Sequence, residues 1–130
     1  MHKIMLNLHE KGLPKLKPSA QSYTIIINAC AFSANMITDK HEKSKILQIA
    51  TDALHDLENS ATANATDITY GTYITACHRL IGYDEILLKR LLSKTYVDAV
   101  KNGVGSKYLL KQLKRASRNL YNELVHHGSL

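Results

Sequence analysis

Five basic residues near the C-terminus form the densest cluster of side chains in the sequence that could bind an anion. They are Lys107, Lys111, Lys114, Arg115 and Arg118. Four of them follow one another at steps of four, three and four residues, a spacing that places side chains on one face of a helix. Such a face can contact the phosphates of a nucleic acid, with an affinity that falls as salt is added. A solvated basic helix face explains the same pattern equally well.

The charge of the chain is concentrated in the same half. The 130-residue chain has a formal net charge of +6. Residues 1–77 contain seven Lys or Arg and seven Asp or Glu, whereas residues 78–130 contain ten and four. Because a basic half attracts polyanions, the first partner to consider is a nucleic acid. The alternative is a basic surface whose only effect is solubility.

No other group of residues has the spacing that catalysis or metal binding needs. The two cysteines, Cys30 and Cys77, have no CxxC partner and are expected to be small buried helix residues. The seven histidines show no HxxxH spacing, and no Ser/His/Asp or paired-carboxylate arrangement stands out. No apolar run is long enough to cross a bilayer. We therefore expect a protein that is not an enzyme, holds no metal or other cofactor, and does not enter a membrane.

An internal repeat indicates which elements position these side chains. Residues 22–31 (SYTIIINACA) recur in diverged form as residues 69–78 (TYGTYITACH), 47 residues later. The alignment pairs Tyr23 with Tyr70 and Cys30 with Cys77. A self-match at this distance predicts stacked helical hairpins, each of which buries its apolar face against its neighbours. The composition agrees, since a chain with 45% hydrophobic residues, two Pro and no Trp favours an all-α fold.

Besides a short helix over residues 1–10, the apolar periodicity predicts five helical segments. We expect helices over about residues 19–32, 40–59, 67–82, 84–101 and 107–127. Asp67 is expected to cap the third of them. Ile49 is expected on a buried face, and Val97 and Val100 are expected among the apolar residues of the fourth segment. The last segment is either one helix or two helices with a bend near Ser117.

Several stretches resemble the pentatricopeptide repeat. PSAQSYTIIINACA and ATDITYGTYITACHRLIG are similar to the first helix of such a repeat, and ILQIATDALHDLE is similar to its second helix. MHKIMLNLHEKGLPKLKPS resembles the second helix and exit turn of a preceding repeat. The resemblance covers residues 1 to about 101. Family repeats are shorter than the 47-residue spacing found here, and the excess falls in the segments 33–40 and 59–66, where surface loops tolerate insertions.

This resemblance implies an α-solenoid of helix-turn-helix repeats with a C-terminal helical cap. Residues 1–18 would be the end of a preceding repeat, so that the chain would be a C-terminal fragment of a longer protein. Residues 19–66 would form one repeat with loop insertions, and residues 67–102 a second repeat. Residues 103–130 would form the basic cap.

The resemblance also implies a function, which is binding of single-stranded RNA at about one base per repeat. Base-facing positions would be Thr24 with Thr66 or Asp67, and Gly71 with Lys101 or Asn102. Gln21 and Ile68 occupy the positions where the family wedges a side chain between bases. Since Gly71 has no side chain with which to contact a base, the second repeat would be a spacer or lack specificity. The protein would then be part of an organellar RNA processing or stability factor in a mitochondrion or plastid, alongside RNA-processing proteins.

A protein-interaction scaffold of the tetratricopeptide type is the alternative function. Its first helices would grip a peptide instead of RNA, although the Trp and Leu-Gly-Tyr signature of that repeat is missing here. Tyr108 and Tyr121 could stack on bases, but packing within the cap is the simpler interpretation. The charge of the groove surface distinguishes the two functions, because RNA binding requires a basic groove and base-facing polar residues. The neutral charge balance of residues 1–77 weakens the RNA interpretation for that half.

Overall fold

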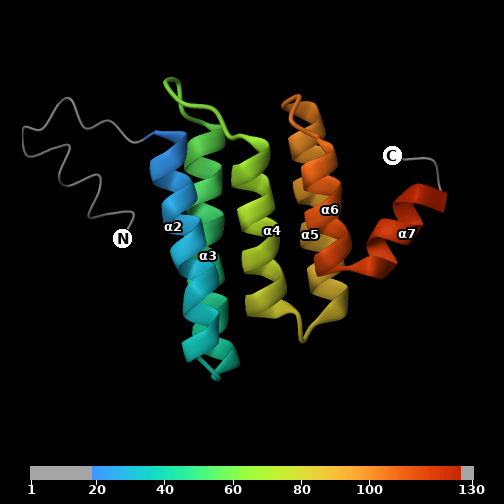
Figure 1. The fold of residues 1–130 in the computed structure, drawn as a ribbon. Helices are drawn as coiled ribbons and strands as arrows, with labels where there is room; N and C mark the ends of the chain where they lie inside the picture. The colour runs from blue at the N-terminus through green and yellow to red at the C-terminus, as the bar shows by residue number, and fades with distance from the viewer. Residues whose placement is uncertain (1–18, 127–130) are drawn as a thin grey trace, which may run out of the picture.

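The computed structural model describes residues 19–126, and within this range the chain is all-α (Figure 1). The helices are α2 (Ala20–Ser33), the short 3-10 helix η1 (Ala34–Met36), α3 (Lys40–Glu58), α4 (Asp67–Ile81), α5 (Glu85–Lys101), α6 (Lys107–Ala116) and α7 (Arg118–His126). The expected all-α class is confirmed. The segment 1–18, predicted to be the end of a preceding repeat, lies outside the described residues.

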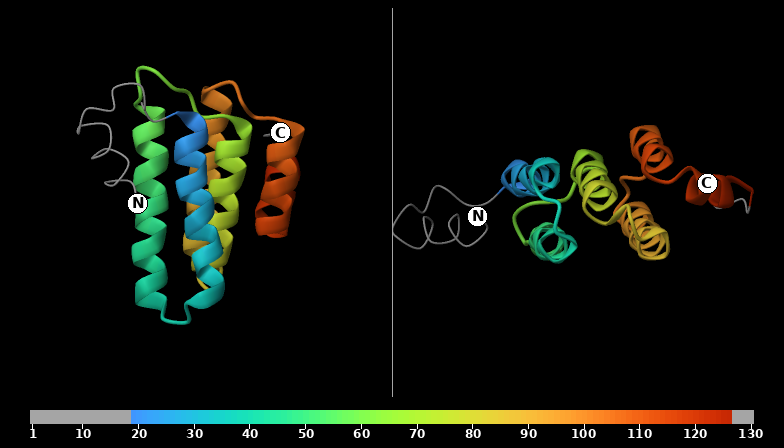
Figure 2. Two further views of the ribbon diagram at one scale, coloured as in Figure 1. Left: turned by 60° about the vertical axis from the view of Figure 1, so that its left-hand side comes forward. Right: turned by 90° about the horizontal axis from the view of Figure 1, so that it is seen from below.

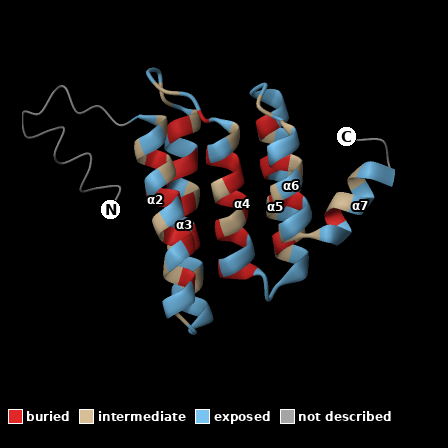
Figure 3. Ribbon diagram, in the orientation of Figure 1, coloured by how far each residue is buried: buried red, intermediate tan, exposed pale blue. Residues whose placement is uncertain are grey.

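The helices form two layers. Helices α2, α4 and α6 lie side by side in one row, which we call the first layer, and α3 and α5 lie behind them in a second layer (Figure 2). Helix α4 is central, because it packs against α2, α3, α5 and α6. Nine of its fifteen residues are buried, and they run along the helix (Figure 3). Helix α7 packs against α6 at the end of the row.

The three first-layer helices start with the same hydrogen bond. The side-chain oxygens of Ser19, Thr66 and Ser106 accept the N–H of the residue three positions later. At Thr66 the bond is reciprocal, since the Thr69 hydroxyl accepts the Thr66 N–H. The prediction that Asp67 caps this helix is therefore wrong by one residue. Thr66 is the residue with extended backbone, and Asp67 is already helical.

The repeated residues form the core. Tyr23 and Tyr70 are both buried, as are Cys30 and Cys77, so the burial predicted for the two cysteines is confirmed. The predicted burial of Ile49 is wrong, since its exposed fraction is 41%. In α3 the buried stripe runs through Leu47, Ala50, Leu54 and Leu57, and Ile49 lies beside it. In α5 the buried residues include Leu88, Leu92 and Ala99, whereas Val97 and Val100 are exposed by 49% and 51%.

The C-terminal segment is two helices, which settles the alternative that the sequence left open. Ser117 has an extended backbone (φ −153°, ψ 97°) that ends α6, and its hydroxyl accepts the Leu120 N–H at the start of α7. Helix α7 then runs in a different direction from α6 (Figure 1). The prediction that Arg118 continues the basic face of residues 107–114 is consequently wrong, because the break comes before it.

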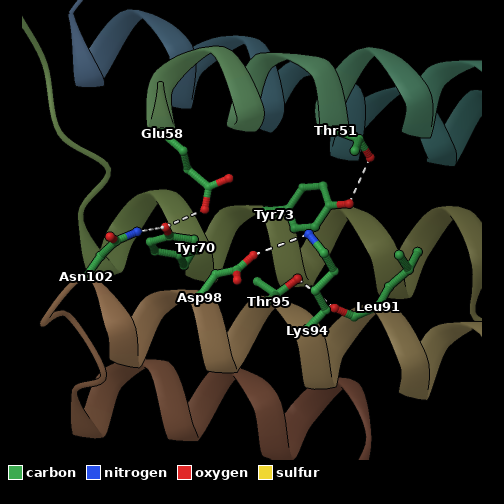
Figure 4. A network of polar contacts seen from close by, with 9 residues as sticks. All are labelled: Thr51, Glu58, Tyr70, Tyr73, Leu91, Lys94, Thr95, Asp98 and Asn102. Carbon is green, nitrogen blue, oxygen red and sulfur yellow. Dashed lines mark hydrogen bonds and ion pairs between the residues drawn. The ribbon is translucent and has the colours of Figure 1, made fainter. Parts of the chain in front are cut away.

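A polar network joins α4 to both second-layer helices (Figure 4). The Tyr70 hydroxyl donates to a Glu58 carboxylate oxygen at the end of α3 and accepts from the Asn102 side-chain amide that follows α5, at 2.7 Å in each case. Further along α4, the Tyr73 hydroxyl lies 2.8 Å from that of Thr51. Buried polar groups are tolerated when they are hydrogen-bonded in this way, and such bonds fix how neighbouring helices sit.

Candidate nucleic-acid interface

The outward side of the first layer carries two parallel stripes of side chains, which we call the outer face. On α2 the stripe consists of Gln21, Ile25, Asn28 and Phe32, and on α4 it consists of Ile68, Thr72, Thr75 and Arg79. Each residue of the first stripe is 47 positions before its counterpart in the second. The last pair touches, since the Arg79 guanidinium lies 5.9 Å from the centre of the Phe32 ring. Residues at equivalent positions of the internal repeat thus match on the surface as well as in the core.

A groove lies between these stripes. It has a volume of about 560 Å³ and is lined by Ala20, Gln21, Thr24, Ile25, Asn28, Thr66, Ile68 and Thr72. Four of the eight residues predicted to face bases or to wedge between them line it together, namely Gln21, Thr24, Thr66 and Ile68. Lys101 and Asn102 do not line it. Its described lining carries no formal charge, so the expectation of a basic groove is not met between α2 and α4. The groove therefore offers apolar surface, hydroxyls and amides to whatever enters it.

The hydroxyl of Thr24 is already engaged in the folded chain. It donates its only proton to the Ala20 carbonyl at 2.7 Å, and its oxygen lies 2.9 Å from the Thr69 hydroxyl oxygen. Thr69 must then be the donor in that second contact, which leaves one lone pair on Thr24 free. In this arrangement Thr24 can accept a hydrogen bond from an amino group of a ligand, but it cannot donate one.

The other two predicted base-facing residues lie between α4 and α6 instead. The Asp67 carboxylate accepts bonds from the Ile68 N–H and from the Ser106 hydroxyl, at 2.9 and 3.0 Å. Gly71 is buried beneath Tyr108 and Gln112, and a Cβ there would lie 2.8 Å from a Tyr108 ring carbon. The structure thus gives Asp67 and Gly71 positions at a helix contact and brings neither into the groove.

Three of the basic residues gather at the far end of the row. Lys107, Lys111 and Lys114 line a pocket of about 260 Å³ between α6 and α7, together with Leu110 and Tyr121. We call it the α6–α7 pocket. The Lys114 ammonium lies 5.3 Å from the centre of the Tyr121 ring. Arg115 is exposed on α6 outside this lining, and Arg118 lines a separate pocket with residues of α5.

Sequence reasoning missed most of the outer face. Ile25, Asn28, Phe32 and Thr72 were not singled out, although they are exposed or half-buried beside the predicted residues. The signal was present as a second spacing of four, three and four residues, offset from the buried stripe and repeated after 47 residues. It would have been found by applying the repeat alignment to the non-core positions.

The described side chains form no metal-ligand cluster, and neither cysteine is an ionised thiol at neutral pH. Among residues 19–126, no three His, Cys, Asp or Glu converge as metal ligands. Burial raises the pKa of the Cys77 thiol to about 12 and also raises that of Cys30, so both thiols are protonated at neutral pH. In the same range no helix combines the length and hydrophobicity needed to cross a membrane.

The comparisons with known proteins add no assignment to this geometry. No protein-family model, curated protein or solved structure matches the chain. Three features of the described helices bear on function. They are the uncharged groove, the outer face that contains it, and the lysine-lined pocket at one end.

Proposed function

We propose that this protein binds single-stranded RNA along the first layer, as a pentatricopeptide-like α-solenoid in an organellar RNA processing or stability factor. The observation that carries the proposal is the groove between α2 and α4. Residues predicted from the two repeats line it together, with Gln21, Thr24 and Thr66 from the first and Ile68 from the second. The pairs α2–α3 and α4–α5 supply the two repeats of the solenoid.

The groove suits unpaired bases better than a duplex. Ile25, Ile68 and Phe32 are exposed by 59%, 51% and 59%, and apolar or aromatic surface of this kind contacts the flat faces of bases. Asn28 and Gln21 stand beside them with both donors and acceptors for base edges. In a duplex those faces are stacked and those edges are paired, so only a single strand can use the groove.

Phosphates would be held by α6, which adjoins α4 in the same row. Lys107, Lys111 and Lys114 form no ion pair with another residue of the described range, so their charges are available to a ligand. In this arrangement the uncharged groove between α2 and α4 would contact the bases, and the lysines of α6 would contact the phosphates. The mechanism is passive: a bound strand is shielded from nucleases and kept from forming structure, or is held in place for a partner enzyme.

The test is binding of one labelled RNA by two variants that place a carboxylate at equivalent positions. Ile68 and Ile86 are each the second residue of their helix, and both are exposed, but only Ile68 lines the groove. A Glu in the first turn of a helix is favourable, so both variants should fold. We expect Ile68→Glu to weaken binding of a mixed-sequence single strand by about tenfold or more, because apolar contact is lost and a phosphate is repelled. Ile86→Glu should bind as the unmodified chain does.

The same titrations, read by fluorescence anisotropy, include a matched duplex. Stronger binding to the single strand and a selective loss in Ile68→Glu support the proposal. Equal loss in both variants would show that charge alone drives binding and would overturn the role of the groove. Absence of binding to either RNA at low salt would overturn RNA binding. The apolar lining of the groove would then favour a peptide ligand, and the interaction-scaffold function would take its place.

Salt dependence tests the phosphate contacts separately. For single strands, each phosphate neutralised contributes about 0.7 to the slope of log affinity against log salt. Replacing Lys111 by Ala should therefore lower that slope by about 0.7 if this lysine contacts a phosphate. Lys45→Ala is the control, since Lys45 is an exposed lysine of α3 outside the lysine-lined pocket. Identical slopes for the two variants would contradict the assignment of Lys111.

A further inference from the structure

The α6–α7 pocket is built differently from the rest of the first layer. One side of α6 supplies the ammonium groups of Lys107, Lys111 and Lys114, spaced at four and three residues, and α7 supplies the Tyr121 ring as the opposite wall. Leu110 adds apolar surface to the same lining. A cationic wall facing an aromatic ring in a concave site is suited to an anion that carries a nucleoside.

The charges of this pocket are not neutralised by the protein. The nearby carboxylate of Glu123 on α7 pairs with Lys89 of α5, and Asp98 pairs with Lys94. No carboxylate of the described residues lines the pocket. Like charges at helical steps of three and four residues repel one another, so a bound anion would relieve the repulsion among the three lysines.

The three lysine charges of the pocket distinguish a terminal phosphate of an RNA strand from an internal one. An internal phosphodiester carries a single negative charge, whereas a terminal phosphomonoester carries about −1.5 to −2 at pH 7 because its second pKa is near 6. Three ammonium groups around one concave site match the more highly charged terminal group. The surrounding ring and leucine then contact the terminal nucleoside.

The place of the pocket in the fold agrees with this choice. Helix α6 is the last helix of the first layer, and α7 turns away from the row and packs against it (Figure 1, Figure 2). A strand lying across α2, α4 and α6 reaches the α6–α7 pocket after it has passed the groove. We propose that this pocket binds the terminal phosphomonoester of the RNA strand, an inference that rests on the RNA-binding function proposed above.

The experiment compares three RNAs of identical sequence with an internal fluorophore. One carries a 5′-phosphate, one carries a 3′-phosphate, and one has hydroxyls at both ends. We expect one of the phosphorylated RNAs to bind at least about fivefold more tightly than the unphosphorylated RNA at pH 7.5. The end that gains affinity identifies the polarity of the strand. At pH 5.5 the gain should shrink, since the phosphomonoester then loses its second charge.

Two variants locate the effect. Lys111→Ala should remove the preference for the phosphorylated end while leaving the helical circular dichroism unchanged, and Lys45→Ala, on the second-layer helix α3, should retain the preference. Equal affinity for all three RNAs would overturn the inference and leave RNA binding intact. A preference that survives in Lys111→Ala would likewise overturn it. Failure of all three RNAs to bind would overturn RNA binding itself, so the two failures are distinguishable.

Discussion

Replacing Ile74 by Ala is expected to lower the free energy of unfolding by about 2–5 kcal/mol. Ile74 is fully buried on α4, the helix that packs against all the others of the two layers, so truncation leaves a cavity that several elements border. Chemical denaturation followed by circular dichroism at 222 nm measures the change. Since the chain is small and has one core, its unfolding should be two-state enough for such a comparison.

The matched control is Ile68→Ala on the same helix. Ile68 is 51% exposed and lines the groove, so the same truncation should change stability by less than about 0.5 kcal/mol. Ile74→Ala should therefore lower the free energy of unfolding, whereas Ile68→Ala should mainly lower the affinity for RNA. Equal stability losses would mean that Ile68 is buried by elements beyond residues 19–126, and that the groove is closed in the full chain.

Stability is expected to fall steeply in alkaline solution. Burial raises the pKa of Cys77 from 9.0 to about 12, and burial raises the pKa values of Tyr70 and Tyr73 above their ordinary value of 10.0 as well. In the unfolded chain these groups lose their protons at lower pH than in the folded chain. Above pH 9 the unfolded state thus binds fewer protons, so the free energy of unfolding decreases as pH rises.

For Cys77 alone the expected loss is about 1.4 kcal/mol for each pH unit between 9 and 12. The stabilisation is fully present below pH 9 and is lost as the pH approaches 12. Urea titrations at pH 7, 9 and 10.5 in the presence of a reductant measure it. In Cys77→Ala the decline between pH 9 and 10.5 should be shallower than in the unmodified chain. The same decline in both would show that this thiol is not the group responsible.

Buried positions could be predicted from the sequence where the apolar spacing lies within a single helix. Tyr23, Cys30, Tyr70 and Cys77 repeat at fixed positions, and the structure buries all four. The bend at Ser117 could not be decided in this way. Leu109, Leu113, Ala116, Leu120 and Leu124 continue the helical spacing across it, and so periodicity alone is the same for one helix or two.

Periodicity also does not specify the contacts between helices. Val97 and Val100 are apolar residues at helical spacing, yet both are about half exposed in the structure. The candidate site shows the same limit. Gln21 and Ile68 reach one groove because they are equivalent in the repeat, whereas Gly71 lies at the contact with α6. That contact joins residues about 40 positions apart with no matching sequence pattern.

The first-layer helices start with the same capping bond although the number of residues between them differs. The caps Ser19, Thr66 and Ser106 are separated by 47 and then by 40 residues, yet α2, α4 and α6 stand in one row. The seven-residue difference is taken up by the second-layer helices and the connections. A repeat can therefore grow or shrink in its turns without shifting the surface it contributes. The length of a repeat depends on its connections and its second-layer helix. The spacing of the side chains on the outer face depends instead on how closely α2, α4 and α6 pack.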